Sequence, residues 1–345
     1  MRRGAQNTKP VRINFAGRAR RVGSTTSPVG CSSPFILATT TMPPVVELRL
    51  EFDYGGAVYF APRVIEILNS TLPVDGAKTP VKAAAALDAL FGENYSAEAD
   101  DSAEGFLWWF WALMHDLSRQ VPYNSPEAER LARTLQALHD LPTKSVKLGK
   151  SWGGGTLEQW RDMPFFGPTY REALDDDPGA GDEEGRKQRF LNLQSYAARA
   201  AGLGVIEVEG WCLWALWTLV EALEGSMTPV RGAPDEINDD PAAVQGYMVK
   251  SAAAWIIFAG NRLYGRDEEV VGASAGPLWR LSKEEIVKLK RKTKGTDGFC
   301  PERWNLWKQR FARIMDTEKL EADVRSEAGC AVTAMEAAEK FHTPT

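Results

Sequence analysis

Apolar residues recur at helical spacing along most of this chain, and they are densest in residues 104–122. Trp108, Trp109, Phe110 and Trp111 follow one another there, with further apolar residues on both sides. Burying one such ring removes roughly 150–250 Å² from water. A helix this apolar is unstable at a surface, so we expect other helices to wrap around it.

The same spacing predicts about eleven helices in total. Their starts carry recognisable signals, such as Thr79-Pro80, Ser125-Pro126 and a capping box of Ser282 with Glu285. The expected helices cover residues 63–69, 81–91, 104–121, 126–138, 168–174, 186–201, 210–223, 241–264, 282–292, 302–315 and 318–341. We therefore predict an all-α fold, a single multi-helix bundle of about ten or eleven helices with a Trp-rich core.

One stretch alternates like a strand instead. In residues 45–52 every second side chain is apolar, a turn follows at 53–56, and residues 57–60 are suited to return. A short N-terminal β-hairpin is thus an expectation, although an isolated hairpin is only marginally stable.

The composition adds detail to the predicted core. The chain has 345 residues, 44% of them hydrophobic, and all 12 tryptophans lie between Trp108 and Trp307. The core, and any ligand pocket in it, should therefore be rich in indole rings. Four cysteines are scattered without a CxxC pair, which indicates thiols in a reducing compartment rather than a disulfide framework.

Charge divides the chain into a tail and a body. Residues 1–43 are basic, rich in Ser and Thr and free of acidic residues, and we expect a disordered tail. The alternatives are a mitochondrial presequence or a start at Met42. We expect residues 44–345 to form one domain in the cytoplasm, or in mitochondria if the tail is a presequence.

The charge and the apolar runs of the body argue against nucleic acid and against a membrane span. Beyond residue 46 the body holds 34 basic and 46 acidic residues, which disfavours nucleic acid. The longest apolar run, residues 210–220, is too short for a bilayer, which needs ~20 residues. We therefore expect no membrane span and no nucleic-acid partner.

None of the familiar catalytic and metal-binding motifs is complete in this sequence. Gly149-Lys150-Ser151 ends like a phosphate-binding loop, but Lys144 stands where that loop needs glycine. There is no GxSxG sequence, and the three histidines form no cluster with Cys or carboxylates, so we expect no metal and no cofactor.

The roles of two charged motifs remain open. His115-Asp116 is an acid–base pair or, as we favour, has a surface or packing role, because adjacent helical residues point about 100° apart. The basic run Lys288–Lys294 suits phosphates, an anionic membrane or an import receptor, but we favour a solvated helix end.

The best candidate site is a Gly-interrupted aromatic block, residues 149–168, together with the short helix after it. Polar side chains beside aromatic walls are typical of ligand pockets. The candidate ligand-binding residues are Trp152, Trp160, Arg161, Asp162, Arg171 and Glu172. The competing interpretation is that Arg161 and Asp162 satisfy loop amides and carbonyls.

Several stretches, in this order, resemble a fungal family of uncharacterised proteins known as domain of unknown function 3632. They are SRQVP (118–122), WRDMPFFGPTYREAL (160–174), LNLQSYAAR (191–199), AAWIIFAGNRLY (253–264) and GFCPERWNLWKQRF (298–311). The family pattern has Trp-Asn after REA, where this chain has Leu174 and Asp175. The resemblance implies a soluble fungal α-helical protein over residues 50–340, without implying an activity.

Two classes of function stay open. The first is a protein that binds a small molecule or a protein partner in an aromatic cleft, for which Trp-rich walls suit planar or cationic groups. The second is an enzyme of fungal small-molecule metabolism with acid–base residues in the same cleft, the candidates being Asp162, Glu172, His115 and Arg171. We favour binding, because no catalytic constellation is recognisable. Oligomeric state is not predicted.

Overall fold

The computed structural model describes residues 46–52, 54–95, 102–149, 154–177, 181–206, 208–230, 233–268 and 298–342. Several predictions fall outside these residues: the 1–43 tail, Trp152, the 282–292 helix with its capping box, and the basic run Lys288–Lys294.

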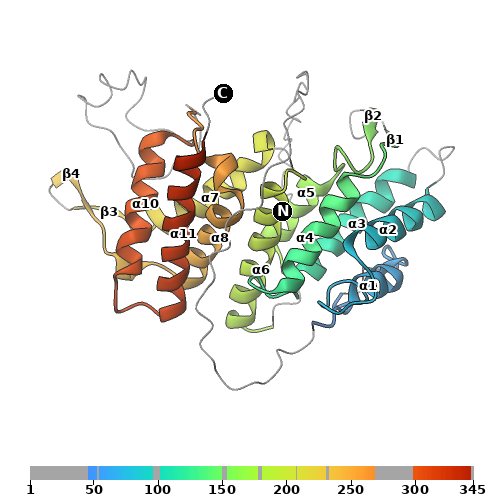
Figure 1. Cartoon of the computed structure of the whole chain (residues 1–345), viewed down its shortest axis with the longest axis horizontal. Coiled ribbons are helices and arrows are strands. Elements are labelled where there is room, and N and C mark those ends of the chain that lie inside the picture. The colour runs from blue at the N-terminus through green and yellow to red at the C-terminus, as the bar shows by residue number, and fades with distance from the viewer. Residues whose placement is uncertain are drawn as a thin grey trace, which may run out of the picture. The chain divides into compact units, whose positions relative to one another are not determined.

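The described residues form ten α-helices and two small hairpins, which confirms the all-α prediction (Figure 1). The helices are α1 (Ala61–Asn69), α2 (Pro80–Asn94), α3 (Ser102–Ser118), α4 (Pro126–His139), α5 (Phe166–Asp175), α6 (Glu183–Gly202), α7 (Val208–Glu224), α8 (Gly246–Leu263), α10 (Pro301–Met315) and α11 (Ala322–Phe341). None of the helices in this part of the chain is long and apolar enough to cross a membrane.

Two helix starts follow the predicted capping chemistry. The Thr79 side chain accepts a hydrogen bond from the Lys82 amide at 3.3 Å, and Ser125 accepts one from the Ala128 amide at 3.2 Å. In both helices proline occupies the first turn, where its missing N–H costs nothing. Local sequence therefore sets these two boundaries.

A single hydrophobic core runs through the helices. Trp111, Trp255 and Trp307 are fully buried, and they belong to α3, α8 and α10. Trp160, Trp214 and Trp304 lie in the same cluster, while Trp108, Trp109 and Trp217 pack against it half-buried. Indole rings from distant parts of the chain thus meet in one interior, as the sequence predicts.

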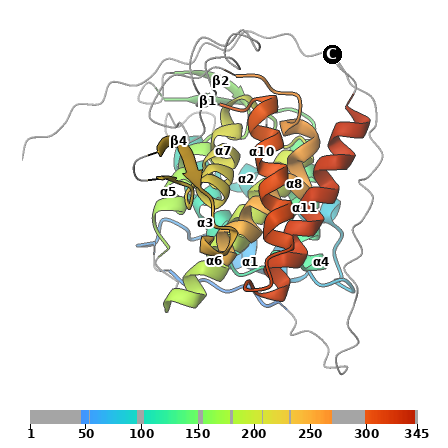
Figure 2. The same cartoon turned by 90° about the vertical axis from the view of Figure 1, so that its left-hand side faces the viewer.

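The C-terminal helices α8, α10 and α11 pack together, and both views show α10 and α11 side by side (Figures 1 and 2). A fully buried ion pair joins α10 to α7. The Arg303 guanidinium donates to both Glu224 oxygens, at 2.7 and 2.9 Å, and the Trp307 indole donates to Glu224 at 2.8 Å. These three bonds compensate the two buried charges, whose desolvation would otherwise be very unfavourable.

Helices α6 and α8 approach closely at Gly202. A Cβ atom at this position would overlap the backbone carbonyl oxygen of Phe258. Glycine is therefore required here by contact between two backbones rather than by an unusual dihedral angle.

The expected N-terminal hairpin does not form. Residues 46–52 form no helix and lie in no sheet, and residues 55–60 form turns. Side-chain amides take the place of a neighbouring strand: Asn69 bonds the Leu48 backbone and Gln120 bonds the Arg49 backbone. The alternation therefore does not mark a paired strand here, and of its apolar positions Leu48 is buried whereas Leu50 is exposed.

Hairpins occur at two places that the sequence pattern marks as irregular or as loop. Strand β1 (Ser145–Leu148) pairs antiparallel with β2 (Gly155–Glu158), and β3 (Thr228–Val230) with β4 (Ala233–Asn238). Gly154 and Gly155 have φ of 62° and 124°, which suits the turn before β2. The helix expected at 241–264 is also divided, into a 3₁₀ turn at Pro241–Ala243 and α8.

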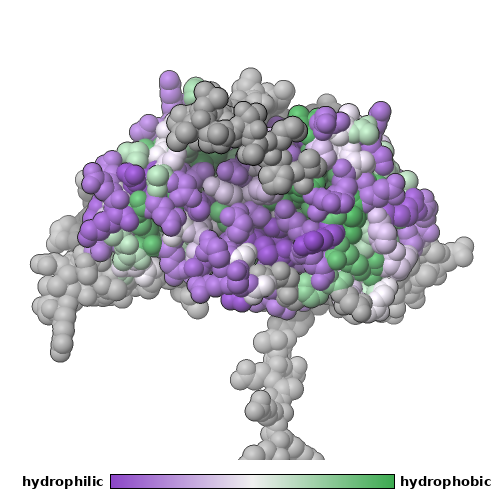
Figure 3. Space-filling view, turned by 90° about the horizontal axis from the view of Figure 1, so that it is seen from below, coloured by the Kyte–Doolittle hydropathy of each residue, from purple (hydrophilic) through white to green (hydrophobic). Residues whose placement is uncertain are grey.

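One face of the molecule is largely hydrophilic. Figure 3 shows purple residues over most of the face seen from below, with hydrophobic residues gathered on the right. That is the side on which Figure 1 places α1.

Candidate functional site

Trp160, the first residue of the predicted site, belongs to the core. Its side chain is 3% exposed, and its indole N–H donates to Asp88 Oδ1 at 2.9 Å. Its ring meets Trp111 edge to face at a centroid distance of 5.9 Å and also contacts Phe91. Trp160 thus anchors the turn after β2 against α2 and α3.

The charged candidates lie on the surface. Arg161, Asp162, Arg171 and Glu172 are all exposed. Asp162 accepts a hydrogen bond from the Glu158 amide at 2.7 Å, which is the turn-satisfying role weighed against ligand binding. Arg171 pairs with Asp175 at 3.3 Å. These residues serve separate local roles, and ligand binding by them stays a prediction.

The turn that carries these candidates has unusual backbone geometry. Met163 and Phe165 are non-glycine residues with φ of 47° and 66°. Such conformations cost free energy and persist where packing compensates. Both side chains are buried, at 5% and 7% exposure, so the core supplies that compensation.

His115 is fully buried between α3, α5 and α6. Its Nε2 lies 3.1 Å from Thr169 Oγ1 and 3.3 Å from the Phe166 carbonyl oxygen. Its ring contacts Phe166, Tyr170 and Tyr196. Burial lowers the pKa of His115 to about 3, so the imidazole is neutral. This geometry supports the packing role.

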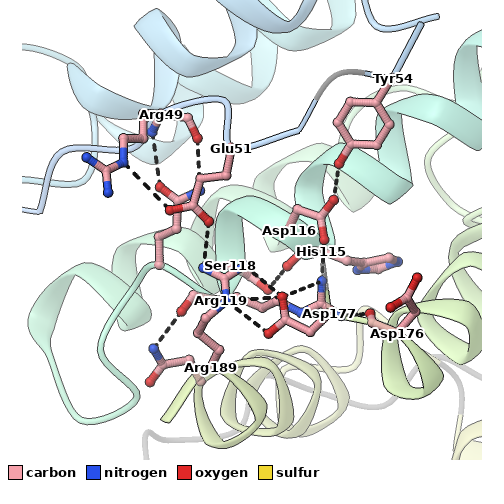
Figure 4. A network of polar contacts seen from close by, with 12 residues as sticks. Arg49, Glu51, Tyr54, His115, Asp116, Ser118, Arg119, Asp176, Asp177 and Arg189 are labelled. Carbon is pink, nitrogen blue, oxygen red and sulfur yellow. Dashed lines mark hydrogen bonds and ion pairs between the residues drawn. The ribbon is translucent and has the colours of Figure 1, made fainter. Parts of the chain in front are cut away.

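Asp116 belongs to a polar network around Arg119 that sequence reasoning did not assemble (Figure 4). Arg119 is only 2% exposed. Its guanidinium pairs with Asp116, lies 3.7 Å from Asp177, and donates to the carbonyl oxygens of Ala173 and Asp176. Arg119 thereby ties the end of α3 to the chain that follows α5.

Arg189 extends the network toward the N-terminal segment. Its guanidinium lies 2.9 Å from Asp177 and 2.7 Å from Glu51, and the Tyr54 hydroxyl donates to Asp116. Asp177 belongs to the acidic stretch after α5, and its side chain is only 12% exposed. Two arginines, Arg119 and Arg189, compensate its charge.

Burial raises the pKa of Asp116 to about 6, although Arg119 and Arg189 act in the opposite direction. The network thus holds a carboxyl group that is easier to protonate than usual. The one available sequence signal was Arg119, which lies inside the SRQVP motif at 118–122.

A pocket lies elsewhere, between the end of α8, the start of α10 and the end of α11. Its volume is about 90 Å³, and its lining includes Tyr264, Phe299, Trp304 and His342. The Tyr264 ring lies 5.1 Å, centroid to centroid, from both Trp304 and His342. Aromatic rings therefore form much of the wall.

Four polar contacts surround this pocket. The Trp304 indole donates to Glu339 Oε1 at 3.0 Å, which fixes the ring against α11. On the other side, Arg266 pairs with Glu268, and the Glu268 amide donates to the Phe299 carbonyl oxygen at 2.7 Å. Cys300 also lines the pocket and caps α10, accepting from the Arg303 amide at 3.4 Å. Sequence reasoning did not single out this pocket, although GFCPERW (298–304) supplies part of its wall.

No metal site accompanies these features. Within the residues that the structure describes, no group of three or more His, Cys, Asp or Glu side chains is arranged to hold a metal ion.

Comparison with known proteins gives one match. The model of a family described as protein of unknown function (DUF3632) matches residues 111–311, which is more than half of the chain. Neither the curated proteins nor the solved structures yield a match.

Proposed function

We propose that this chain, which belongs to the DUF3632 family, is a binding protein that holds one small group in the Tyr264–Trp304–His342 pocket. The group is the head of a small molecule or the side-chain end of a protein partner. The observation that carries the proposal is a pocket of about 90 Å³ walled by aromatic rings. An engineered cavity of roughly 150 Å³ takes benzene, so this pocket suits a smaller group.

The aromatic part of the wall suits a compact cation, and Arg266, which also lines the pocket, is paired with Glu268. Aromatic faces attract ammonium groups placed within about 6 Å of the ring centroid. Tyr264 and His342 meet at an interplanar angle of 83°, and Tyr264 and Trp304 at 51°, so the three ring planes are inclined to one another. A methylated ammonium group fits both the size and the chemistry.

The test compares two probes of similar shape, tetramethylammonium and neutral tert-butanol, by ligand-observed NMR on the full chain. We expect the cation to bind at least tenfold more tightly than the alcohol, and Tyr264→Ala to lose that preference. Tyr59→Ala is the matched control, because Tyr59 is 65% exposed and does not line the pocket. Equal binding by all three proteins would remove the proposed site.

Native mass spectrometry of the purified chain addresses the natural ligand. A retained small molecule that Tyr264→Ala loses and Tyr59→Ala keeps would support the same pocket.

Catalysis is the second candidate function, since Cys300 and His342 bring two titratable groups to the same pocket. The distinction is chemical. A copurified molecule returned to fresh protein keeps its mass if the protein only binds, and changes mass if it is an enzyme. Cys300→Ser should then slow the conversion.

A further inference from the structure

Residues 46–52 are held by two side-chain amides. The Leu48 amide donates to Asn69 Oδ1 at 2.8 Å, and Asn69 Nδ2 donates to the Leu48 carbonyl oxygen at 2.9 Å. Arg49 repeats this arrangement one residue later with Gln120, at 3.0 and 2.9 Å. Each amide thus bonds both backbone groups of a single residue.

The pattern of bonds implies that the two amides approach the segment from opposite sides. In an extended chain successive residues point their N–H and C=O groups to opposite edges. Asn69 is the last residue of α1, and Gln120 follows α3, so these elements grip the chain from both edges. Because the bonds go to backbone groups, this grip recognises extended conformation and not side-chain identity.

Side-chain recognition comes from two positions in the segment. Leu48 is 2% exposed and enters the hydrophobic core, whereas Leu50 is 44% exposed. Three residues after Leu48, the Glu51 carboxylate pairs with Arg189 at 2.7 Å (Figure 4). The segment is therefore bound as an extended peptide with an apolar anchor and an acidic residue three positions on.

We propose that Asn69, Gln120 and Arg189 form a peptide-binding groove that residues 46–52 occupy in cis. The partner is a protein segment of the same chemistry, extended, with an aliphatic anchor and a carboxylate three residues later. It binds when residues 46–52 leave. This site is separate from the aromatic pocket, so neither proposal depends on the other.

The cis segment acts as a competitor for the partner. A segment tethered by a short linker has a local concentration in the millimolar range, so a free peptide at micromolar concentration binds only to a vacated groove. Weakening the cis segment should therefore reveal binding in trans.

The experiment uses the full chain and a fluorescein-labelled peptide of residues 46–52, VELRLEF. Two variants vacate the groove. Leu48→Asp places a charge on the anchor, and Glu51→Lys opposes Arg189. By fluorescence anisotropy, we expect either variant to bind the peptide at least tenfold more tightly than the unchanged chain.

Two controls define the groove. Adding Asn69→Ala and Gln120→Ala to the vacated chain should abolish binding, as should a peptide that itself carries Leu48→Asp. Circular dichroism verifies that each variant is folded.

Three results would overturn the proposal. If a folded Leu48→Asp or Glu51→Lys chain binds VELRLEF no more tightly than it binds the altered peptide, the groove is excluded. Binding that survives loss of both amides places the peptide elsewhere. If neither vacated chain folds, residues 46–52 are an inseparable part of the core and do not leave it.

Discussion

At the scale of single residues, burial decides protonation. His115 and Asp116 are neighbours on α3, yet burial lowers the pKa of the first and raises that of the second. The difference follows from charge type, because a buried site disfavours the cationic imidazolium and the anionic carboxylate alike. Each group is thus biased toward its neutral form.

We expect His115 to make stability depend on pH. Its pKa is about 3 in the folded chain against about 6.5 in an unfolded one, so its contribution is complete above pH 6.5 and is lost as the pH falls toward 3. Relative to His115→Gln, which cannot titrate, the free energy of unfolding should drop by up to about 1.4 kcal/mol per pH unit below pH 6.5. Urea unfolding at pH 7, 6 and 5 measures this, and a constant difference would contradict a buried neutral imidazole.

The sequence predicted the roles of some of these residues and not of others. The sequence favoured a surface or packing role for His115, because adjacent helical residues point about 100° apart and cannot act as an acid–base pair. It gave no sign that Glu51, Asp177 and Arg189 meet, since ion pairs form between residues 12 and 138 positions apart. Periodicity reports only on neighbours a few residues away.

At the scale of elements, the contact between α6 and α8 depends on Gly202. We expect Gly202→Ala to cost at least about 2 kcal/mol of unfolding free energy, because overlap with a backbone atom forces the helices apart. Gly260→Ala is the matched control within α8. Its added Cβ would lie 3.7 Å from its nearest neighbours, so it should be neutral or stabilise by up to about 1 kcal/mol through helix propensity. Chemical denaturation tests both, and equal effects would contradict the close approach.

Helices were predictable because their apolar faces are long and repeat. The strands were not, because β1 and β2 have four residues each and are mostly exposed. Such strands bury too little surface to impose an apolar alternation. Residues 46–52 are the converse case. Their apolar alternation predicts a strand, yet Leu48 is buried without a sheet being formed.

At the scale of the whole molecule, the fold class could be predicted from composition and periodicity, whereas the pocket could not. Its walls come from the end of α8 and the residues after it, the start of α10 and the residues before it, and His342, which follows α11. The meeting of these parts depends on packing. The sequence interpretation placed a ligand pocket at residues 149–168, whereas this pocket is lined by residues 263–266, 299–301, Trp304 and His342.

One hydrophobic cluster connects helices from α1 to α11. We therefore expect residues 44–345 to unfold in a single transition, with tryptophan fluorescence and far-ultraviolet circular dichroism giving the same denaturant midpoint. Two separated midpoints would show that the cluster belongs to two independent domains.

The buried Glu224–Arg303 pair also bears on how the chain is made. A ribosome completes Glu224 79 residues before Arg303. A carboxylate buried without its partner is strongly unfavourable. We therefore expect the Glu224 end of α7 to pack stably only after α10 has been synthesised. Until then this end of the helix should stay accessible to water and to chaperones.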